Sequence, residues 1–198
     1  MNSHDEMASA AAETARVVSG VSAGQLADPT PCKEWDVRAL LNHIILWTGY
    51  SAEQRAYGGS VAEELMTKDF AAEPGFAEDY AAQVAKAVAA WSEPAAWERE
   101  LDIMGSATPG VDVAELLIAE TVLHGWDLAV ATGQEYRCDD AVAAVVLRTV
   151  EANAELFRQY RGFGPPVPVP DDAPVFGRAL ARSGRDPLAP FQGVSSAP

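Results

Sequence analysis

One segment, residues 112–133, constrains the fold of this chain more than any other. Its sequence marks both ends of a helix: Asp112 is a candidate N-cap with Glu115 three residues later as a capping box, and Gly133 follows the last turn. Apolar residues lie between these ends on nearly all sides: Val113, Leu116, Leu117, Ile118, Val122, Leu123, Trp126, Leu128 and Val130. A helix that is apolar all round belongs inside a protein. The segment therefore predicts the central helix of a bundle.

This helix carries an acidic side chain into the expected core. Glu120 lies one helical turn before His124, on the same stripe of the helix. Burying an ionised carboxylate costs on the order of several kcal/mol unless another group pairs with it. A carboxylate and an imidazole four residues apart on a helix have the spacing of metal ligands. The same two residues could equally form a hydrogen-bonded pair without a metal.

A third candidate ligand comes from another predicted helix. The segment 37–57 reads as a helix with Asp36 as its N-cap and with Gly58 and Gly59 at its end. His43 lies in it among apolar neighbours, so it is either a core histidine bonded to a backbone carbonyl or a ligand. The only other histidine, His4, belongs to a polar start, residues 1–6, that we expect to be frayed and exposed to solvent.

Together, His43, Glu120 and His124 form a possible set of two histidines and one carboxylate on two facing helices. Helix bundles build metal sites in this way, with side chains from neighbouring helices pointing inward. Three protein ligands leave coordination positions for water or substrate, which is the pattern of a catalytic zinc site. The same ligands would also accept iron, nickel or manganese.

The rest of the chain completes an all-α prediction. Further helices are expected over residues 7–19, 76–91 and 141–160, the last with Asp139 or Asp140 as its cap, together with a short helix over 61–66 and an extended segment over 97–110. The proline-rich tail and a short helix near its end have too few apolar residues for a core of their own, and we interpret them as a strap on the bundle. We thus expect a single domain over residues 1–190 and a disordered tail over 191–198.

Charge and composition limit the partners. Lys and Arg number 14 and Asp and Glu 29, a net charge of −15, which disfavours nucleic acid and anionic membranes as partners. The sequence has no apolar run of transmembrane length and no leader-like start, and its two cysteines, Cys32 and Cys138, lie far apart. Two distant cysteines are too few for a disulfide framework, which fits a reducing cytoplasm. A homodimer would bury spare apolar helix faces.

Several other residues have two interpretations. Asp127 could accept the second N–H of His124, or it could face solvent or cap the adjoining loop. Trp35, Trp47 and Trp126 are interpreted as core residues, and Cys32 as a small buried thiol because no base is evident beside it. Arg38 could bind an anionic substrate or lie exposed on its helix. We expect residues 60–75 and the tail to line the substrate cavity.

Two motifs carry a resemblance to a known family. They are TPCxxWxVxxLxxH over residues 30–43 and ExxxHGWDLA over residues 120–129, the latter followed by Thr132-Gly133. Together they resemble the N-terminal domain of mycothiol-dependent maleylpyruvate isomerases, which belongs to the DinB-like superfamily of metal-binding four-helix bundles. The Gly-Arg-Asp-Pro sequence at residues 184–187 resembles a group of actinobacterial members. The resemblance spans nearly the whole chain, to Pro187.

The resemblance implies both a fold and a chemistry. It implies a DinB-like four-helix bundle in which His43, Glu120 and His124 ligate a divalent metal, zinc foremost, and in which mycothiol, or bacillithiol in relatives, is the thiol cosubstrate. The partners would then be this low-molecular-weight thiol and a small electrophile. The isomerases carry an additional C-terminal domain that this sequence does not show. We therefore expect a thiol-dependent transferase or isomerase-like enzyme, with a non-catalytic metal-stabilised binding or stress protein, or a metal-assisted hydrolase, as alternatives.

Overall fold

The structure, a computed structural model, describes residues 3–103 and 105–188, and its longest helix is α6, Gly110–Thr132. Gly133 ends α6 in the left-handed conformation at φ +71°, as the sequence predicted. The predicted start is wrong: Pro109 occupies the N-cap position, and Asp112 lies inside the first turn. The helix begins earlier because strand β2, Ser106–Pro109, runs directly into it.

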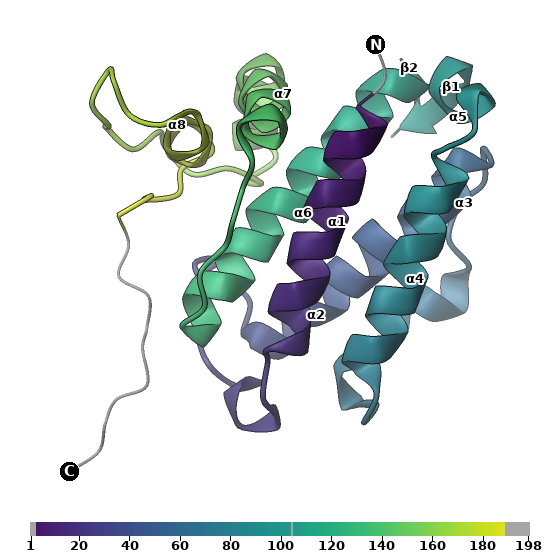
Figure 1. Cartoon of the computed structure of the whole chain (residues 1–198), viewed down its shortest axis with the longest axis horizontal. Helices are drawn as coiled ribbons and strands as arrows, with labels where there is room; N and C mark the ends of the chain where they lie inside the picture. Colours follow the sequence, from purple (N-terminus) through teal and green to yellow (C-terminus); the bar gives the residue numbers. More distant parts are fainter. Residues whose placement is uncertain (1–2, 104, 189–198) are drawn as a thin grey trace.

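The all-α bundle predicted from the sequence is confirmed. α6 packs against α1, His4–Ser19, and α2, Val37–Ile44, while α4, Phe76–Ala90, packs on the other side of α1. Figure 1 shows α1, α4 and α6 side by side with α2 crossing behind them. Among the described residues, no helix combines the length and hydropathy needed to cross a bilayer.

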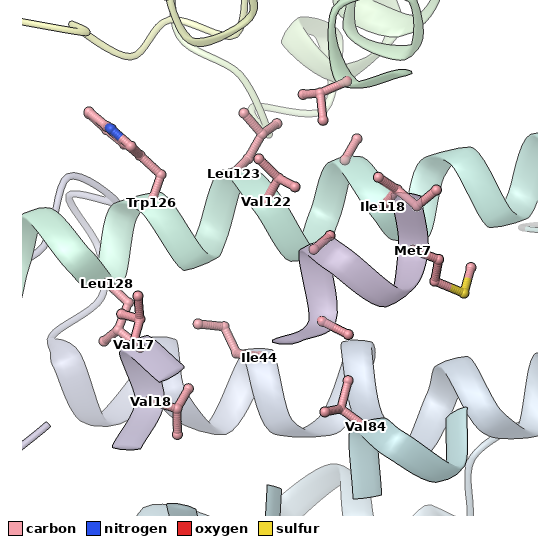
Figure 2. Close-up of a cluster of buried hydrophobic side chains, with 14 of the residues drawn as sticks. Met7, Val17, Val18, Ile44, Val84, Ile118, Val122, Leu123, Trp126 and Leu128 are labelled. Atoms are coloured by element: carbon pink, nitrogen blue, oxygen red, sulfur yellow. The ribbon is translucent and has the colours of Figure 1, made fainter. Parts of the chain in front are cut away.

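A core of aliphatic side chains joins these helices. Figure 2 shows buried residues that come from four elements of the bundle: Val17 and Val18 of α1, Ile44 of α2, Val84 of α4, and Ile118, Val122 and Leu128 of α6. Gly125 lets α1 approach α6, because a Cβ at this position would lie 2.6 Å from Thr14 Oγ1 and 2.5 Å from the Tyr136 ring. This contact fixes the half of α6 that carries His124.

The helix predicted over residues 37–57 is continuous but changes type along its length. Asp36 caps α2 by accepting a hydrogen bond from the Ala39 amide at 2.8 Å, as predicted. The helix then continues as a π-helix, Ile45–Ser51, and as α3, Ala52–Ala56. A π-helical segment within an α-helix is uncommon and is frequently found at functional sites.

The connections between the main helices are mostly short elements. The predicted short helix over 61–66 is a 3₁₀ turn, Glu63–Thr67, and two more turns of this type are Ala23–Gln25 and Phe70–Ala72. Pro94 begins a short helix, α5, Pro94–Glu98, which includes the first two residues of the segment predicted to be extended, 97–110. Further along that segment, β1, Glu100–Ile103, pairs antiparallel with β2, as an extended segment predicts.

The C-terminal part packs on the bundle from one side. α7, Asp140–Gln159, follows the predicted N-cap residue Asp139 and packs against α6, and α8, Val175–Arg182, packs against α7. Figure 1 shows α7 and α8 nearly end-on, so they cross the direction of the bundle helices. This arrangement matches the predicted strap. The predicted disordered tail, 191–198, lies outside the described residues.

The start of the chain is more ordered than the sequence suggested. α1 begins at His4, whose Nε2–H donates a hydrogen bond to the Val88 carbonyl of α4 at 3.0 Å. The frayed, solvent-exposed His4 that we expected is therefore wrong, because α4 supplies an acceptor that no local pattern reveals. His4 contacts neither His43 nor His124, since its hydrogen bond goes to this backbone group and its other ring nitrogen lies beside Asp5.

The packing of α6 predicts the effect of a core truncation. Ile118 is fully buried, and we expect Ile118→Ala to lower the free energy of unfolding by about 2–5 kcal/mol because the cavity left behind cannot fully collapse. Urea denaturation measures this value. Leu156→Ala on α7, where the side chain is exposed, is the matched control and should change it by less than about 0.5 kcal/mol. Equal effects for the two variants would contradict the described packing of α6.

Candidate metal centre

The three side chains singled out from the sequence lie together in the structure. His43 on α2 and His124 on α6 both direct Nε2 toward the same oxygen of Glu120, at 2.5 Å and 3.5 Å from Oε1 respectively. One donor atom from each residue lies within 4.8 Å of the other two. Because α2 packs directly on α6, residues 77 positions apart in the chain meet at this point.

Glu120 is less buried than the sequence suggested. Its side chain is 34% exposed, whereas those of His43 and His124 are 21% and 15% exposed. Burial alone would raise the pKa of Glu120, but the neighbouring His124 and the hydrogen bond from His43 outweigh it and lower this pKa to about 2. The carboxylate is therefore ionised at neutral pH and faces open space on one side.

Asp127 holds the orientation of His124. Its Oδ2 accepts a hydrogen bond from His124 Nδ1 at 3.1 Å, and the residue is fully buried, so the interpretation in which it faces solvent is wrong. A proton on Nδ1 leaves the lone pair of the imidazole on Nε2, the atom that faces Glu120. Carboxylates that fix metal-binding histidines in this way are a common outer layer of metal sites.

Arg185 anchors Asp127 from the C-terminal segment. Its Nε and Nη2 donate hydrogen bonds to the two carboxylate oxygens of Asp127 at 2.9 Å and 2.6 Å, and both side chains are almost fully buried. Burial would raise the pKa of Asp127, but Arg185 and His124 keep it well below its usual range. The Gly-Arg-Asp-Pro motif draws attention to Arg185 in the sequence. Its role is not predictable there, because its partner lies 58 residues away.

Cys32 lies on the other side of the His124 ring from Glu120. Its Sγ is 3.7 Å from His124 Nδ1 and donates a hydrogen bond to Asp127 Oδ2 at 3.1 Å. The expectation that no base lies beside Cys32 is therefore wrong. Burial and the charge of Asp127 raise the pKa of this thiol, so Cys32 stays protonated and acts as a hydrogen-bond donor.

A short turn before α2 places Cys32. Thr30 Oγ1 accepts a hydrogen bond from the Cys32 amide at 3.1 Å and donates one to the Trp35 carbonyl at 2.8 Å. The amide of Trp35 in turn bonds to the Cys32 carbonyl at 2.7 Å. These hydrogen bonds hold residues 30–35 of the first motif in a turn. The turn places Cys32 and Trp35 beside the histidines.

Aromatic rings cover the two histidines. The Trp35 ring centre is 4.5 Å from that of His43 and 5.7 Å from that of His124, and the Trp47 ring centre is 6.3 Å from that of His43. Trp126 is buried as expected, whereas Trp35 and Trp47 pack against the core but are only partly buried. The two indoles therefore form part of the immediate surroundings of the imidazoles.

Two groups of residues in this region have metal-ligand chemistry, and the structure distinguishes them. One is His43, Glu120 and His124, and the other is Cys32, His124 and Asp127. In the second group Asp127 already has Arg185 as its cation, and a metal ion there would be repelled by the guanidinium. In the first group, the described part of the chain places no Lys or Arg within ion-pair distance of Glu120, whose partners are the two histidines. Its donor atoms fit a divalent metal.

Fold and site together define a DinB-like helical bundle with a candidate centre of two histidines and one carboxylate. The profile of the mycothiol maleylpyruvate isomerase N-terminal domain matches residues 7–129 of the chain. The chain belongs to this family. The matched region contains the three candidate ligands as well as Cys32 and Asp127, whereas Arg185 lies outside it.

Relatives of similar length occur in mycobacteria. Two uncharacterized proteins of Mycobacterium tuberculosis, Rv0738 of strain H37Rv and MT0763 of strain CDC 1551, are each 29% identical to this chain over 175 residues, which is 86% of this chain and 91% of each relative. No solved structure matches the chain significantly. The likeness to the mycobacterial proteins therefore extends over more of the chain than the family profile does.

The buried pair of Arg185 and Asp127 predicts a large effect of removing the guanidinium. We expect Arg185→Met to lower the free energy of unfolding by about 3–5 kcal/mol, because it leaves the Asp127 carboxylate buried without its cation. Chemical denaturation measures this loss. Arg178→Met, which removes an exposed arginine from the same segment, is the control. If the two variants are equally stable, Arg185 does not anchor Asp127 in solution.

Proposed function

We propose that this protein is a divalent-metal-dependent enzyme that activates a low-molecular-weight thiol, mycothiol or a close relative, for attack on a small electrophile. The observation that carries the proposal is the convergence of donor atoms from His43, Glu120 and His124 beside a cavity. Membership of the mycothiol maleylpyruvate isomerase N-terminal domain family supports it. The reaction would be a thiol transfer, or an addition followed by isomerisation.

The donor set favours zinc and an open site. Two imidazole nitrogens and one carboxylate oxygen are typical of catalytic zinc sites, in which the remaining positions are left for water or substrate. Iron, nickel and manganese accept the same ligands. The exposed side of Glu120 is where such positions would be reached, since Trp35 and Trp47 cover the histidine rings.

The chain's own residues would prepare this site in two ways. Asp127 and Arg185 hold the His124 ring with Nε2 toward Glu120. Trp35 forms part of the immediate surroundings of the two imidazoles. A divalent metal bound there would lower the pKa of a thiol that reaches it, which supplies a strong nucleophile at neutral pH.

A cavity of about 190 Å³ adjoins the candidate ligands. Glu120 forms part of its wall, and the other lining residues are mainly apolar and come from the π-helix, α3, β1, α6, α7 and the segment after α7: Trp47, Arg55, Ile103, Val113, Leu116, Leu117, Ala119, Leu123, Phe157 and Phe163. Residues 60–75, which we expected to line it, do not. An apolar cavity with a few converging polar groups is the usual form of a small-molecule site.

The proposed ligands predict that His124 and His4 differ in their effect on metal affinity. We expect protein purified without a nickel column to carry one equivalent of metal by elemental analysis, and His124→Ala to lower zinc affinity by more than about 100-fold, because a direct ligand matters more than an outer partner. His4→Ala is the matched control, since His4 bonds to a backbone carbonyl of α4. Metal retained by His124→Ala, or lost equally by His4→Ala, would contradict the assignment.

Thiol dependence separates the proposed enzyme from its alternatives. We expect mycothiol to be consumed together with an electrophile such as monochlorobimane, and chelation or His43→Ala to lower this rate by at least about 100-fold. Mass spectrometry of the conjugate measures it. Turnover that needs no thiol would instead indicate metal-assisted hydrolysis. A protein that loses only thermal stability on chelation, and shows no turnover, would be a metal-stabilised binding protein.

A further inference from the structure

Arg55 is the one cationic side chain among the residues that line the cavity. Its Nε–H donates a hydrogen bond to Ser51 Oγ at 3.2 Å, and within the described ranges no carboxylate oxygen lies within the 4.0 Å that defines an ion pair with its guanidinium. The side chain is partly buried. The guanidinium therefore has donors available to a ligand.

The charged side chains near Arg55 do not form an ion pair with its guanidinium in the described part of the chain. Burial lowers the pKa of Arg55, and the charge of Glu120 raises it. The two charges therefore attract each other, although they do not form an ion pair. Arg38, which the sequence offered as a candidate for binding an anion, instead forms a surface ion pair with Asp69 at 2.6 Å and does not line the cavity. The alternative in which Arg38 lies exposed on its helix therefore holds.

The π-helix brings Arg55 to the same face as His43. These residues are twelve positions apart, which in a regular α-helix of 3.6 residues per turn places them about 120° apart around the axis. A π-helical turn absorbs one additional residue, so the angle around the axis between two residues twelve positions apart falls to about 20°. The segment Ile45–Ser51 therefore puts His43, Trp47 and Arg55 on one side of the rod formed by α2 and α3.

The cavity has the size and lining of a site for a small apolar group. An apolar protein cavity of about 150 Å³ holds a benzene molecule, and this cavity measures about 190 Å³. Phe157 and Phe163 form one part of its wall, and Val113, Leu116 and Leu117 of α6 form another. Glu120 and Arg55 are its only ionisable lining residues within the described part of the chain.

From these observations we infer that the cavity binds an organic acid with an apolar body, such as an aryl-substituted carboxylate, and that Arg55 pairs with its carboxylate. Calling this acid the electrophilic substrate rests on the proposed function, whereas its binding does not. Arg55 would then determine specificity, because a neutral analogue leaves the guanidinium desolvated and unpaired.

Binding of phenylacetate and of its neutral analogue phenylacetamide tests this inference. Calorimetry on the zinc-loaded protein at low ionic strength should show phenylacetate binding at least about tenfold more tightly, the size expected for a charge-assisted hydrogen bond. Arg55→Met should abolish this preference and Arg55→Lys should retain part of it. Arg178→Met, which removes an exposed arginine outside the cavity, should leave the preference unchanged.

Three results would overturn the inference: no preference in the native protein, a preference that survives in Arg55→Met, or a preference that chelation abolishes, which would mean that the carboxylate binds the metal. Metal content and thiol-dependent turnover are measured on the same preparations, purified without a nickel column, before zinc is added. If these are present and the preference is absent, only this inference fails. If the preference is present and the protein carries no metal, the proposed function fails and the acid-binding site remains.

Discussion

The contact of the Glu120 carboxylate with two imidazoles is the interaction on which the site depends. It joins α2 to α6 beside the aliphatic core, and it is made by partly exposed side chains whose mutual attraction favours the ionised carboxylate. The histidines lower the pKa of Glu120, so the oxygen remains an anionic donor. A negative oxygen between two imidazole nitrogens, open on one side, is well suited to a divalent cation.

A chain of two further charged side chains, Asp127 and Arg185, supports this contact. Asp127 fixes His124, and Arg185 fixes Asp127 from a segment that has already passed over α7. The docked C-terminal part is therefore a component of the site as well as a cover for the bundle. The π-helix between α2 and α3 places Arg55 on the same face of the continuous helix as His43. This helix therefore carries both a candidate metal ligand and a candidate anion-binding group.

The sequence predicted the features that depend on local periodicity. The i, i+4 spacing of Glu120 and His124 on an apolar helix, and the apolar surroundings of His43, offered the three as one possible set, and the two family motifs favoured it. The structure brings their donor atoms together. The contacts of Arg185 and Cys32 with Asp127 could not be found in this way, because they span 58 and 95 residues and start from loops. Asp112 was assigned as an N-cap from its residue type, but the hairpin that precedes α6 determines the start of the helix. No local pattern in the sequence marks the π-helix, which decides where Arg55 lies.

X-ray absorption spectroscopy of the zinc-loaded protein, in the absence of any thiol, tests the central claim most directly. Ligation by His43, Glu120 and His124 predicts a first shell of nitrogen and oxygen only, with the outer scattering of two imidazole rings. A sulfur scatterer at about 2.3 Å would place the metal at Cys32 instead. That result, or a shell with fewer than two imidazoles, would contradict ligation by these three residues.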